Sequence, residues 1–245
     1  MSRWRASGLH FLISLFILVT ALALIRLLWY PDFYFAAIGA DGLLAILFAV
    51  DVTLGPLITL IIFRVGKKGL GFDLTFIAAC QLAALLYGMH TVFLARPVFA
   101  VFSGNRFEVV QAVDLDLNGV QDPEFQTMSW TGPRWASLKV PQDEEVVTAV
   151  ISDVLAGGKD FQQYARFLAP YEEARNLAIT KLRPLQRLRR KGVPARERVE
   201  NFLSDHGVGE EEVGYLPLTA RAEHMAVIVT RANGDILGVV RVNPW

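Results

Sequence analysis

The stretch LHFLISLFILVTALALIRLLWY, from Leu9 to Tyr30, decides the fold of the first part of the chain. Its one charged residue is Arg26. A helix that spans about 30 Å of hydrocarbon needs roughly 20 apolar residues, so the stretch predicts a membrane span. It is too long for the apolar core of a signal peptide, and it ends in Trp29 and Tyr30 instead of small residues. We therefore interpret it as a retained anchor.

Two further apolar runs, Leu43 to Phe63 and Leu70 to Leu94, have the same character. Together the three runs predict a transmembrane domain of three α-helices over residues 1–96, with spans at about 9–30, 43–63 and 70–94. The remaining 97–245 are more polar, with 17 Lys and Arg and 20 Asp and Glu against 7 and 4 in the first 96 residues. A mean hydropathy of +0.37 is therefore the average of two different regions. The one cysteine, Cys80, excludes an intrachain disulfide.

The orientation of the spans follows from the basic residues in the short loops. The loop at 31–42 has no Lys or Arg and contains Asp32 and Asp41. Because basic loops stay in the cytoplasm, we expect a cytoplasmic N-terminus and a multi-pass protein of a bacterial inner membrane, with residues 97–245 in the periplasm. Five basic residues support this topology: Arg3, Arg5, Arg64, Lys67 and Lys68.

The region 97–245 predicts an α+β domain with a small antiparallel sheet. Strands are expected at its two ends, including a hairpin around Asn233-Gly234, and helices between them. The expected strands are 98–102, 106–113, 225–230 and 235–242, and the expected helices are 146–155, 160–168, 171–182, 185–191 and 195–206. About 150 residues are enough to bury a separate core.

Asp51 is the most unusual residue, because it lies roughly 12 Å inside the second predicted span by the helix rise. An ionisable residue at that depth is costly and is a candidate for function. Arg26, Tyr87 and His90 are predicted at a similar depth in the other two spans, so they are candidate neighbours of Asp51. One turn after Asp51, Gly55-Pro56 predicts a kink in the helix and a backbone carbonyl without its helical hydrogen bond. The carboxyl group either fixes packing between the spans, contacts another protein's transmembrane helix, or belongs to a proton or ion path.

Candidate chemistry in 97–245 is sparse. Asp114, Asp116, Asn118 and Gly119 match the start of a calcium loop, but Phe125 occupies the position that needs a bidentate Glu, so a solvated turn is expected. The basic segment 181–198 predicts either a solvated face or contact with anionic lipid or an acidic partner, and the predicted topology argues against nucleic acid. Histidines His206 and His224 have no nucleophile or metal-ligand spacing beside them, so we expect no enzyme activity, metal or cofactor.

Taken together, several segments resemble the TfpX/TfpZ family of type IV pilin accessory proteins. The similarity extends over nearly the whole chain. The segments that carry it are Ser2-Arg3-Trp4-Arg5, Trp29-Tyr30-Pro31, 51–60 with Leu54-Gly55-Pro56-Leu57, Gly66-Lys67-Lys68-Gly69-Leu70, Gln81-Leu82-Ala83-Ala84-Leu85, Tyr87-Gly88, Arg96-Pro97, Gly157-Gly158-Lys159-Asp160, Tyr215-Leu216-Pro217-Leu218 and Pro244-Trp245.

The resemblance implies an inner-membrane protein that stabilises or chaperones a type IV major pilin and modulates pilus assembly, with the assembly machinery as a possible further partner. On this hypothesis Asp51, Gly55, Pro56, Arg26 and Tyr87 contact the pilin helix. Two alternatives stay open. One is a pilin-modifying enzyme such as a glycosyltransferase, and the other is a membrane module that senses a periplasmic ligand.

Overall fold

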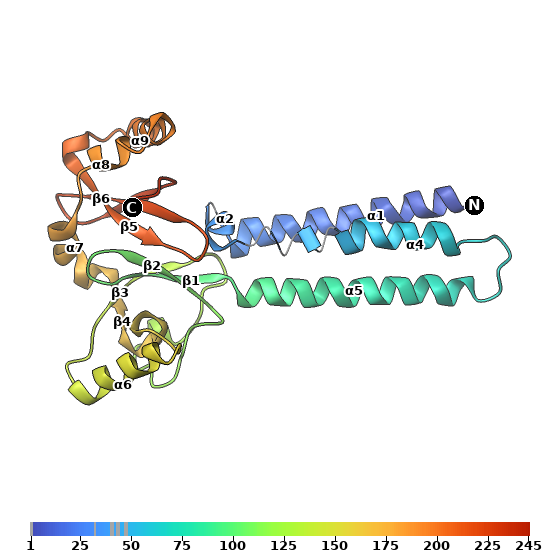
Figure 1. Ribbon diagram of the computed structural model, residues 1–245, viewed down its shortest axis with the longest axis horizontal. Coiled ribbons are helices and arrows are strands. Elements are labelled where there is room, and N and C mark those ends of the chain that lie inside the picture. The colour runs from blue at the N-terminus through green and yellow to red at the C-terminus, as the bar shows by residue number, and fades with distance from the viewer. Residues whose placement is uncertain (1, 32, 40–41, 43–44, 47–48) are drawn as a thin grey trace. The chain divides into compact units, whose positions relative to one another are not determined.

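A computed structural model describes residues 2–31, 33–39, 42, 45–46 and 49–245 of the chain. Its internal contacts divide the chain into two units (Figure 1). The first, which we call the helical unit, comprises Met1–Phe35 and Gly39–Ala95, and the second, the sheet unit, comprises Ala36–Ile38 and Arg96–Trp245.

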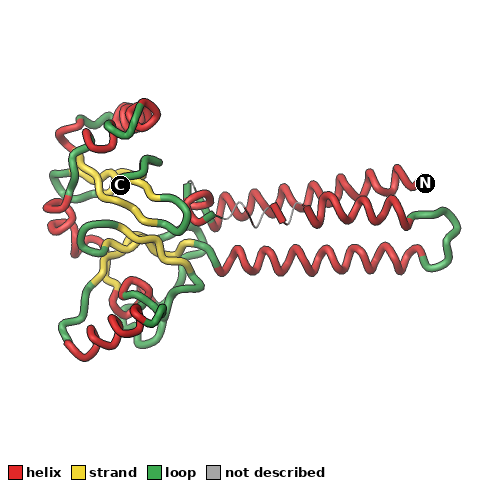
Figure 2. The backbone as a smooth tube through the Cα atoms, viewed as in Figure 1, coloured by secondary structure: helices red, strands yellow, loops and turns green. Residues whose placement is uncertain are grey.

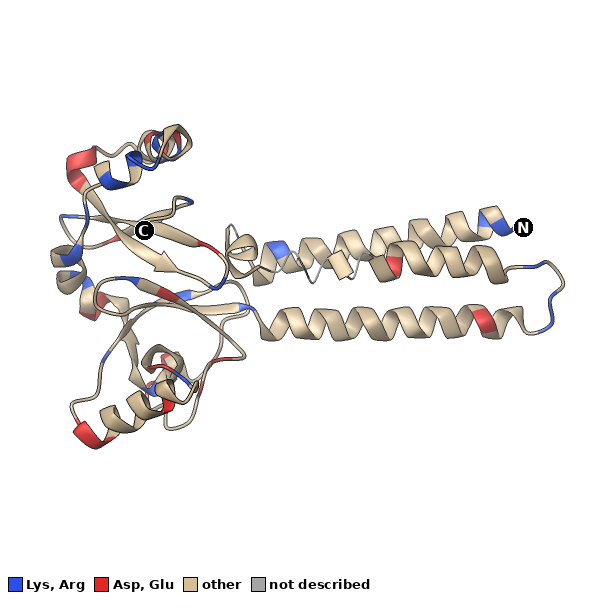
Figure 3. Ribbon diagram, viewed as in Figure 1, with Lys and Arg blue, Asp and Glu red and all other residues tan. Residues whose placement is uncertain are grey.

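Long apolar helices build the helical unit. In Figure 3 their ribbons carry few Lys, Arg, Asp or Glu, which is what burial in hydrocarbon requires. Ser2 caps the first helix by accepting a hydrogen bond from the Arg5 N–H. The segments are α1 (Arg3–Leu24) continuing into the π-helical turn η1 (Ile25–Trp29), the π-helical turn η2 (Ala49–Leu54) continuing into α4 (Gly55–Ile62), and α5 (Leu70–Leu94). The short helix α2 (Tyr34–Ile38) begins in this unit, and its residues 36–38 belong to the sheet unit.

Among the residues that the structure describes, two helices have the length and hydropathy of membrane spans, Arg3–Trp29 and Leu70–Leu94. They correspond to the first and third predicted spans. In the second predicted span, 43–63, residues 43–44 and 47–48 lie outside the described residues, and the structure shows a shorter apolar helix over Ala49–Ile62. Two of the three predicted spanning helices are therefore present among the described residues.

The sheet unit contains one seven-stranded sheet within residues 96–245, all of which are described. The strand order is β4-β3-β1-β2-β5-β6-β7, and the strands are the yellow segments of Figure 2. They are β1 (Pro97–Phe102), β2 (Phe107–Gln111), β3 (Arg134–Leu138), β4 (Leu168–Pro170), β5 (Val213–Thr219), β6 (His224–Thr230) and β7 (Ile236–Val240).

The predicted small antiparallel sheet is wrong in size and in strand direction, although the α+β class is confirmed. The hairpins β1–β2 and β6–β7 are present as expected. However, β3, β4 and β5 are strands that we did not expect. Of these, β3 and β5 pair in parallel with the first hairpin, as β1–β3 and β2–β5. The sheet is therefore mixed.

Pro217 explains why β5 is hidden in the sequence. A proline cannot donate a hydrogen bond and is rare inside a central strand. Tyr215 exchanges both backbone hydrogen bonds with Arg183 at 2.9 Å, so by alternation Pro217 faces the same side. On that side β2 pairs with β5 only from Leu218 onward. The proline thus lies in a gap of the ladder where no donor is needed.

The helices of the sheet unit follow the predictions in part. Asp143 accepts from the Glu145 and Val146 N–H groups and starts α6 (Glu144–Leu155). The helix predicted at 160–168 is wrong, because this segment forms two short 3₁₀ turns, η4 (Phe161–Gln163) and η5 (Ala165–Phe167), and then enters β4. The other segments are η3 (Pro123–Phe125), η6 (Tyr171–Ala174), α7 (Arg175–Lys181), α8 (Gln186–Arg189), α9 (Val193–His206) and η7 (Glu210–Glu212).

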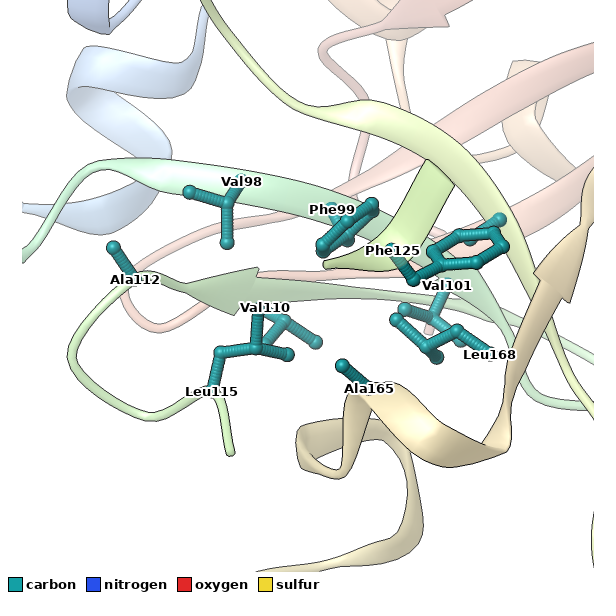
Figure 4. Close-up of a cluster of buried hydrophobic side chains, with 10 residues drawn as sticks. Val98, Phe99, Val101, Val110, Ala112, Leu115, Phe125, Ala165 and Leu168 are labelled. Carbon is teal, nitrogen blue, oxygen red and sulfur yellow. The ribbon is translucent and has the colours of Figure 1, made fainter. Parts of the chain in front are cut away.

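Two clusters of buried side chains stabilise the sheet unit. One packs around β1 and β2 and includes Phe99, Val101 and the fully buried Phe125 of η3 (Figure 4). The other joins β5, β6 and β7 to α8 and α9 through residues such as Leu188 and Ile228. Residues 36–38 also belong to this unit, since the Ala37 carbonyl accepts from the N–H groups of Ala222 at 2.8 Å and Glu223 at 3.2 Å.

Replacing Phe125 with alanine should lower the free energy of unfolding of the sheet unit by about 3–5 kcal/mol, because it leaves a cavity under β1. Hydrogen exchange of the β1 amides, measured by mass spectrometry on the full chain in detergent, reports this change. Val113→Ala is the matched control, since Val113 is 55% exposed and should change stability by at most about 0.5 kcal/mol. Equal protection in the two variants would contradict the assigned core.

Tyr171 makes stability depend on alkaline pH. Its ring is buried and its hydroxyl donates to the Gly234 carbonyl at 2.9 Å. Burial disfavours the phenolate and raises the pKa of Tyr171 from its ordinary value of 10.0 to about 12. Because the unfolded chain releases this proton first, the stability from Tyr171 is present below pH 10 and is lost as the pH rises towards 12.

The Tyr171→Phe variant should unfold about 1 kcal/mol more easily at neutral pH, since it loses one hydrogen bond. Its stability should also fall less than that of the native chain between pH 10 and 12. Urea unfolding at a series of pH values measures both effects. Parallel pH profiles for the two proteins would contradict the raised pKa.

Candidate functional site

The helical unit contains a row of polar side chains between its apolar helices. We call Ser7, His10, Asp51, Thr59 and Gln81 the polar seam. They come from α1, from η2 with its continuation α4, and from α5, so each of these three helical segments contributes at least one member. Polar groups inside such helices need partners within the protein, because lipid offers none.

Pro56 leaves one backbone carbonyl of the seam, that of Asp51, without a hydrogen-bond donor in its own helix. In the π-helical register of η2, the carbonyl of Asp51 would accept from residue 56, and a proline has no N–H to donate. Gln81 of α5 replaces the missing donor, since its Nε2 atom donates to the Asp51 carbonyl oxygen at 3.0 Å. The hydroxyl of Ser7 donates to the Pro56 carbonyl at 2.8 Å. The break in η2 is thus repaired from α5, and Ser7 joins α1 to the same turn.

His10 completes the seam. Its Nε2 atom lies 2.7 Å from Oε1 of Gln81, and its Nδ1 atom lies 2.7 Å from Oγ1 of Thr59. An amide oxygen only accepts, so Nε2 of His10 carries the proton and donates to Gln81. Gln81 therefore uses both ends of its amide, which fixes the separation of α5 from α1 and α4.

Asp51 is 6% exposed, and its Oδ1 atom has no hydrogen-bond partner within the described part of the chain. The residue lines a cavity of about 350 Å³ between α1, α4 and α5, which we call the Asp51 cavity. His10, Thr59 and Gln81 line it too, and most of the remaining wall is aliphatic. A second apolar cavity of about 340 Å³ lies against Gly55, Cys80 and Gln81. A buried polar oxygen without a partner is rare in native proteins and calls for an explanation.

The structure does not bring the predicted neighbours to Asp51. The guanidinium of Arg26 lies 4.4 Å from the centroid of the Phe35 ring, and its side chain is exposed. Tyr87 is 74% exposed and His90 is also exposed. The helix rise predicts how deep a residue lies but not which face of the helix it occupies. At about 100° per residue, Tyr87 lies roughly 240° around α5 from Gln81 and is therefore on a different face.

Gly55 and Pro56, the other two predicted contact residues, are buried within the helical unit. At Gly55 the absence of a side chain is required, because a Cβ atom would overlap the amide of Gln81. Sequence reasoning missed Gln81, His10 and Thr59 as members of the site. The sequence does contain a signal for them, because each of the three apolar runs includes one of these polar residues. A prediction that starts from the depth of Asp51 alone does not detect it.

The candidate calcium loop of the sheet unit is a structural connection. The carboxylate of Asp116 accepts from the Asn118 N–H at 2.8 Å, as in an ordinary turn. The backbone of Asp116 also bonds with Gln163 at 2.7 Å and Ala165 at 2.8 Å. Among the described residues, no three His, Cys, Asp or Glu side chains lie close enough to hold a metal ion.

The basic segment 181–198 is partly neutralised by its own surroundings. Arg189 pairs with Glu210 at 2.7 Å, and Arg198 donates to the Arg241 carbonyl at 2.6 Å. The guanidinium of Arg183 lies 5.1 Å from the ring of Trp245. Lys181, Arg187, Arg190 and Arg196 are exposed, so part of the positive face is open to solvent.

Comparison with known proteins finds three similar proteins of Dichelobacter nodosus. The first, "Fimbrial assembly protein, serogroup I", is 27% identical over 98% of this chain and 95% of its own length. The serogroup E1 protein is 25% identical over the same shares, and the protein of serogroups C1 and C2 is 35% identical over 46% of this chain and 88% of its own length. No family model and no solved structure matches. The chain belongs to the family of fimbrial assembly proteins.

Gly55→Ala should weaken the helical unit by about 1 kcal/mol, because the new methyl group displaces the Gln81 amide and breaks interhelical hydrogen bonds. Unfolding by increasing SDS in mixed micelles measures this change. Gly8→Ala is the control, since no heavy atom lies within 4 Å of a Cβ placed there.

The double variant Gly55→Ala, Gln81→Ala tests the mechanism of that loss. If Gly55 acts by making room for Gln81, the two changes should be less than additive, because the second removes the group that the first displaces. Strictly additive losses would show that Gly55 acts through another contact.

Proposed function

From its membership of the fimbrial assembly family, we propose that this chain is an accessory protein of the bacterial inner membrane that stabilises a type IV pilin and so controls how much pilin enters pili. The observation that carries the proposal is similarity along almost the whole chain, 98% of it, to proteins named for fimbrial assembly. The TfpX/TfpZ resemblance of the quoted segments supports the same role. We propose a non-catalytic action.

The proposed topology has three spans. Arg3–Trp29 and Leu70–Leu94 cross the membrane, and the apolar helix Ala49–Ile62 is the described part of the span between them. The basic loop with Arg64, Lys67 and Lys68 lies in the cytoplasm with the N-terminus. The sheet unit then lies in the periplasm.

In this arrangement each unit has its own task. A pilin that waits in the membrane presents an apolar helix in the lipid layer and a globular head outside it. The helical unit, with the polar seam and the Asp51 cavity, holds the helix, and the sheet unit contacts the head. Once one unit has bound the pilin, the other unit is held close to its own contact surface on the pilin, so its effective concentration there is high. Two contacts that are weak individually are then sufficient for binding.

The variant Asp51→Leu should lower the number of pili per cell without lowering the abundance of the protein itself, because the buried carboxyl group is lost while the apolar surface is kept. Electron microscopy counts the pili, and immunoblotting measures the protein. Asp73→Leu is the matched control, since the Asp73 carboxylate pairs with Lys67 at 2.6 Å near the start of α5, away from the polar seam. Unchanged piliation in Asp51→Leu would remove Asp51 from the mechanism.

Crosslinking in native membranes tests the partner directly. A photoreactive amino acid at Leu82, which lines the Asp51 cavity and is 56% exposed, should capture a pilin. The same amino acid at Leu86, which is 58% exposed and is absent from the lining of that cavity, is the control. Capture of a lipid-linked sugar with no pilin would favour a pilin-modifying enzyme instead.

A further inference from the structure

We propose that the Asp51 cavity binds a positively charged group, an ammonium or guanidinium, carried by an apolar membrane-embedded segment of a partner protein. The carboxylate of Asp51 is the counter-charge. This inference deepens the proposed function and rests on it for the biological partner, but the chemistry of recognition follows from the helical unit alone.

The first observation is the unsatisfied carboxyl oxygen. Asp51 is more than nine-tenths buried, and its Oδ1 atom lacks a partner in the described residues. Leaving a buried acceptor unpaired is costly, and the cost is larger if the group is charged. A donor that arrives with a partner protein removes this cost, so the free helical unit is prepared to bind one.

His10 does not supply that donor. It is the one other titratable side chain in the lining of the cavity, and both of its ring nitrogens are engaged, one with Thr59 and one with Gln81. None of the ion pairs between described residues includes Asp51. Arg26, the basic neighbour predicted from the sequence, instead lies over the Phe35 ring. The carboxyl group therefore makes no ion pair with another described residue, and its Oδ1 atom stays unpaired.

The shape of the cavity suits a long aliphatic stem with a charged end. Its volume of about 350 Å³ is within the usual range of ligand pockets. Apart from the polar seam, the wall consists mainly of aliphatic side chains such as Ile13, Ile17 and Leu85. Lysine and arginine bury such stems against apolar surfaces while their charged ends seek a partner.

The rim of the cavity shows from which side the partner approaches. Leu9 and Ile13 of α1 are each 51% exposed, and Leu82 of α5 is 56% exposed. These exposed apolar residues line the same cavity, so it opens between α1 and α5 towards the lipid. By the helix rise, Asp51 lies roughly 12 Å inside its predicted span, below the level of lipid head groups. A charge on a transmembrane segment reaches that depth, which favours a protein partner over a lipid amine.

The experiment uses the full chain in vesicles of phosphatidylethanolamine and phosphatidylglycerol. The probe is a synthetic Leu-Ala transmembrane peptide with one lysine at mid-depth, and the matched peptide has methionine at that position. Energy transfer between a dye on the peptide and a dye on the protein reports binding. The lysine peptide should bind about tenfold more tightly than the methionine peptide, which corresponds to a single charge pair.

The variant Asp51→Asn should abolish the preference for lysine, and Asp51→Glu should keep part of it. Asp73→Asn should leave the preference unchanged, because Asp73 pairs with Lys67 elsewhere on α5. Circular dichroism and resistance to trypsin establish that each variant is folded. Equal binding of the two peptides, or a preference that persists in folded Asp51→Asn, would overturn the inference.

This assay contains no pilin, so its result is separate from the proposed function. A clear lysine preference together with failure of the membrane crosslinking experiment would refute pilin binding and leave charge recognition standing. A failed peptide assay with successful capture of pilin would refute charge recognition alone. A preference that disappears when phosphatidylethanolamine is included, but is present in pure phosphatidylglycerol, would identify the lipid amine as the occupant and overturn the protein partner.

Discussion

The helical unit depends on one glutamine that uses both ends of its amide. Pro56 deprives the carbonyl of Asp51 of its helical donor, and Gln81 supplies that donor from α5 while it accepts a hydrogen bond from His10 of α1. In the proposed membrane topology these groups have no water as an alternative partner, so the three helical segments would have to stay together for all of them to be satisfied. Gly55 completes the arrangement because it leaves space for the amide.

The same constraint explains why Asp51 is different from the rest of the seam. Its backbone carbonyl is satisfied within the unit, whereas the Oδ1 atom of its side chain is buried without a partner among the described residues. The backbone interaction serves the fold, and the unpaired Oδ1 atom is the group to which we assign binding. This combination of satisfied backbone groups and one unsatisfied side-chain atom is consistent with the proposed role of holding another apolar segment.

Sequence patterns predicted the elements that are determined locally. Apolar length identified α1 and α5, the run 146–155 identified α6, and Asn233-Gly234 marked the β6–β7 hairpin. Features that depend on distant contacts were missed. Strand β5 was not predicted because it contains Pro217, which is tolerated there only because of a gap in the pairing of β5 with β2. The segment 160–168 has the composition of a helix, but it leads into β4, which pairs with β3 at the edge of the sheet. Among the site residues, Asp51 was found by its charge, while Gln81 and His10 required the rotation of each helix about its axis.

The strand order also has a consequence for biosynthesis. Strand β2 lies in the middle of the sheet, yet its partner β5 follows only after residues 112–212 have been made. Until then one edge of β2 presents unpaired backbone groups, which is the condition under which nascent strands pair with the wrong chain. The β1–β4 half can form earlier, whereas the β5–β7 half is added last. Chains that stop short of β5 are thus expected to be prone to aggregation and to degradation by quality-control proteases.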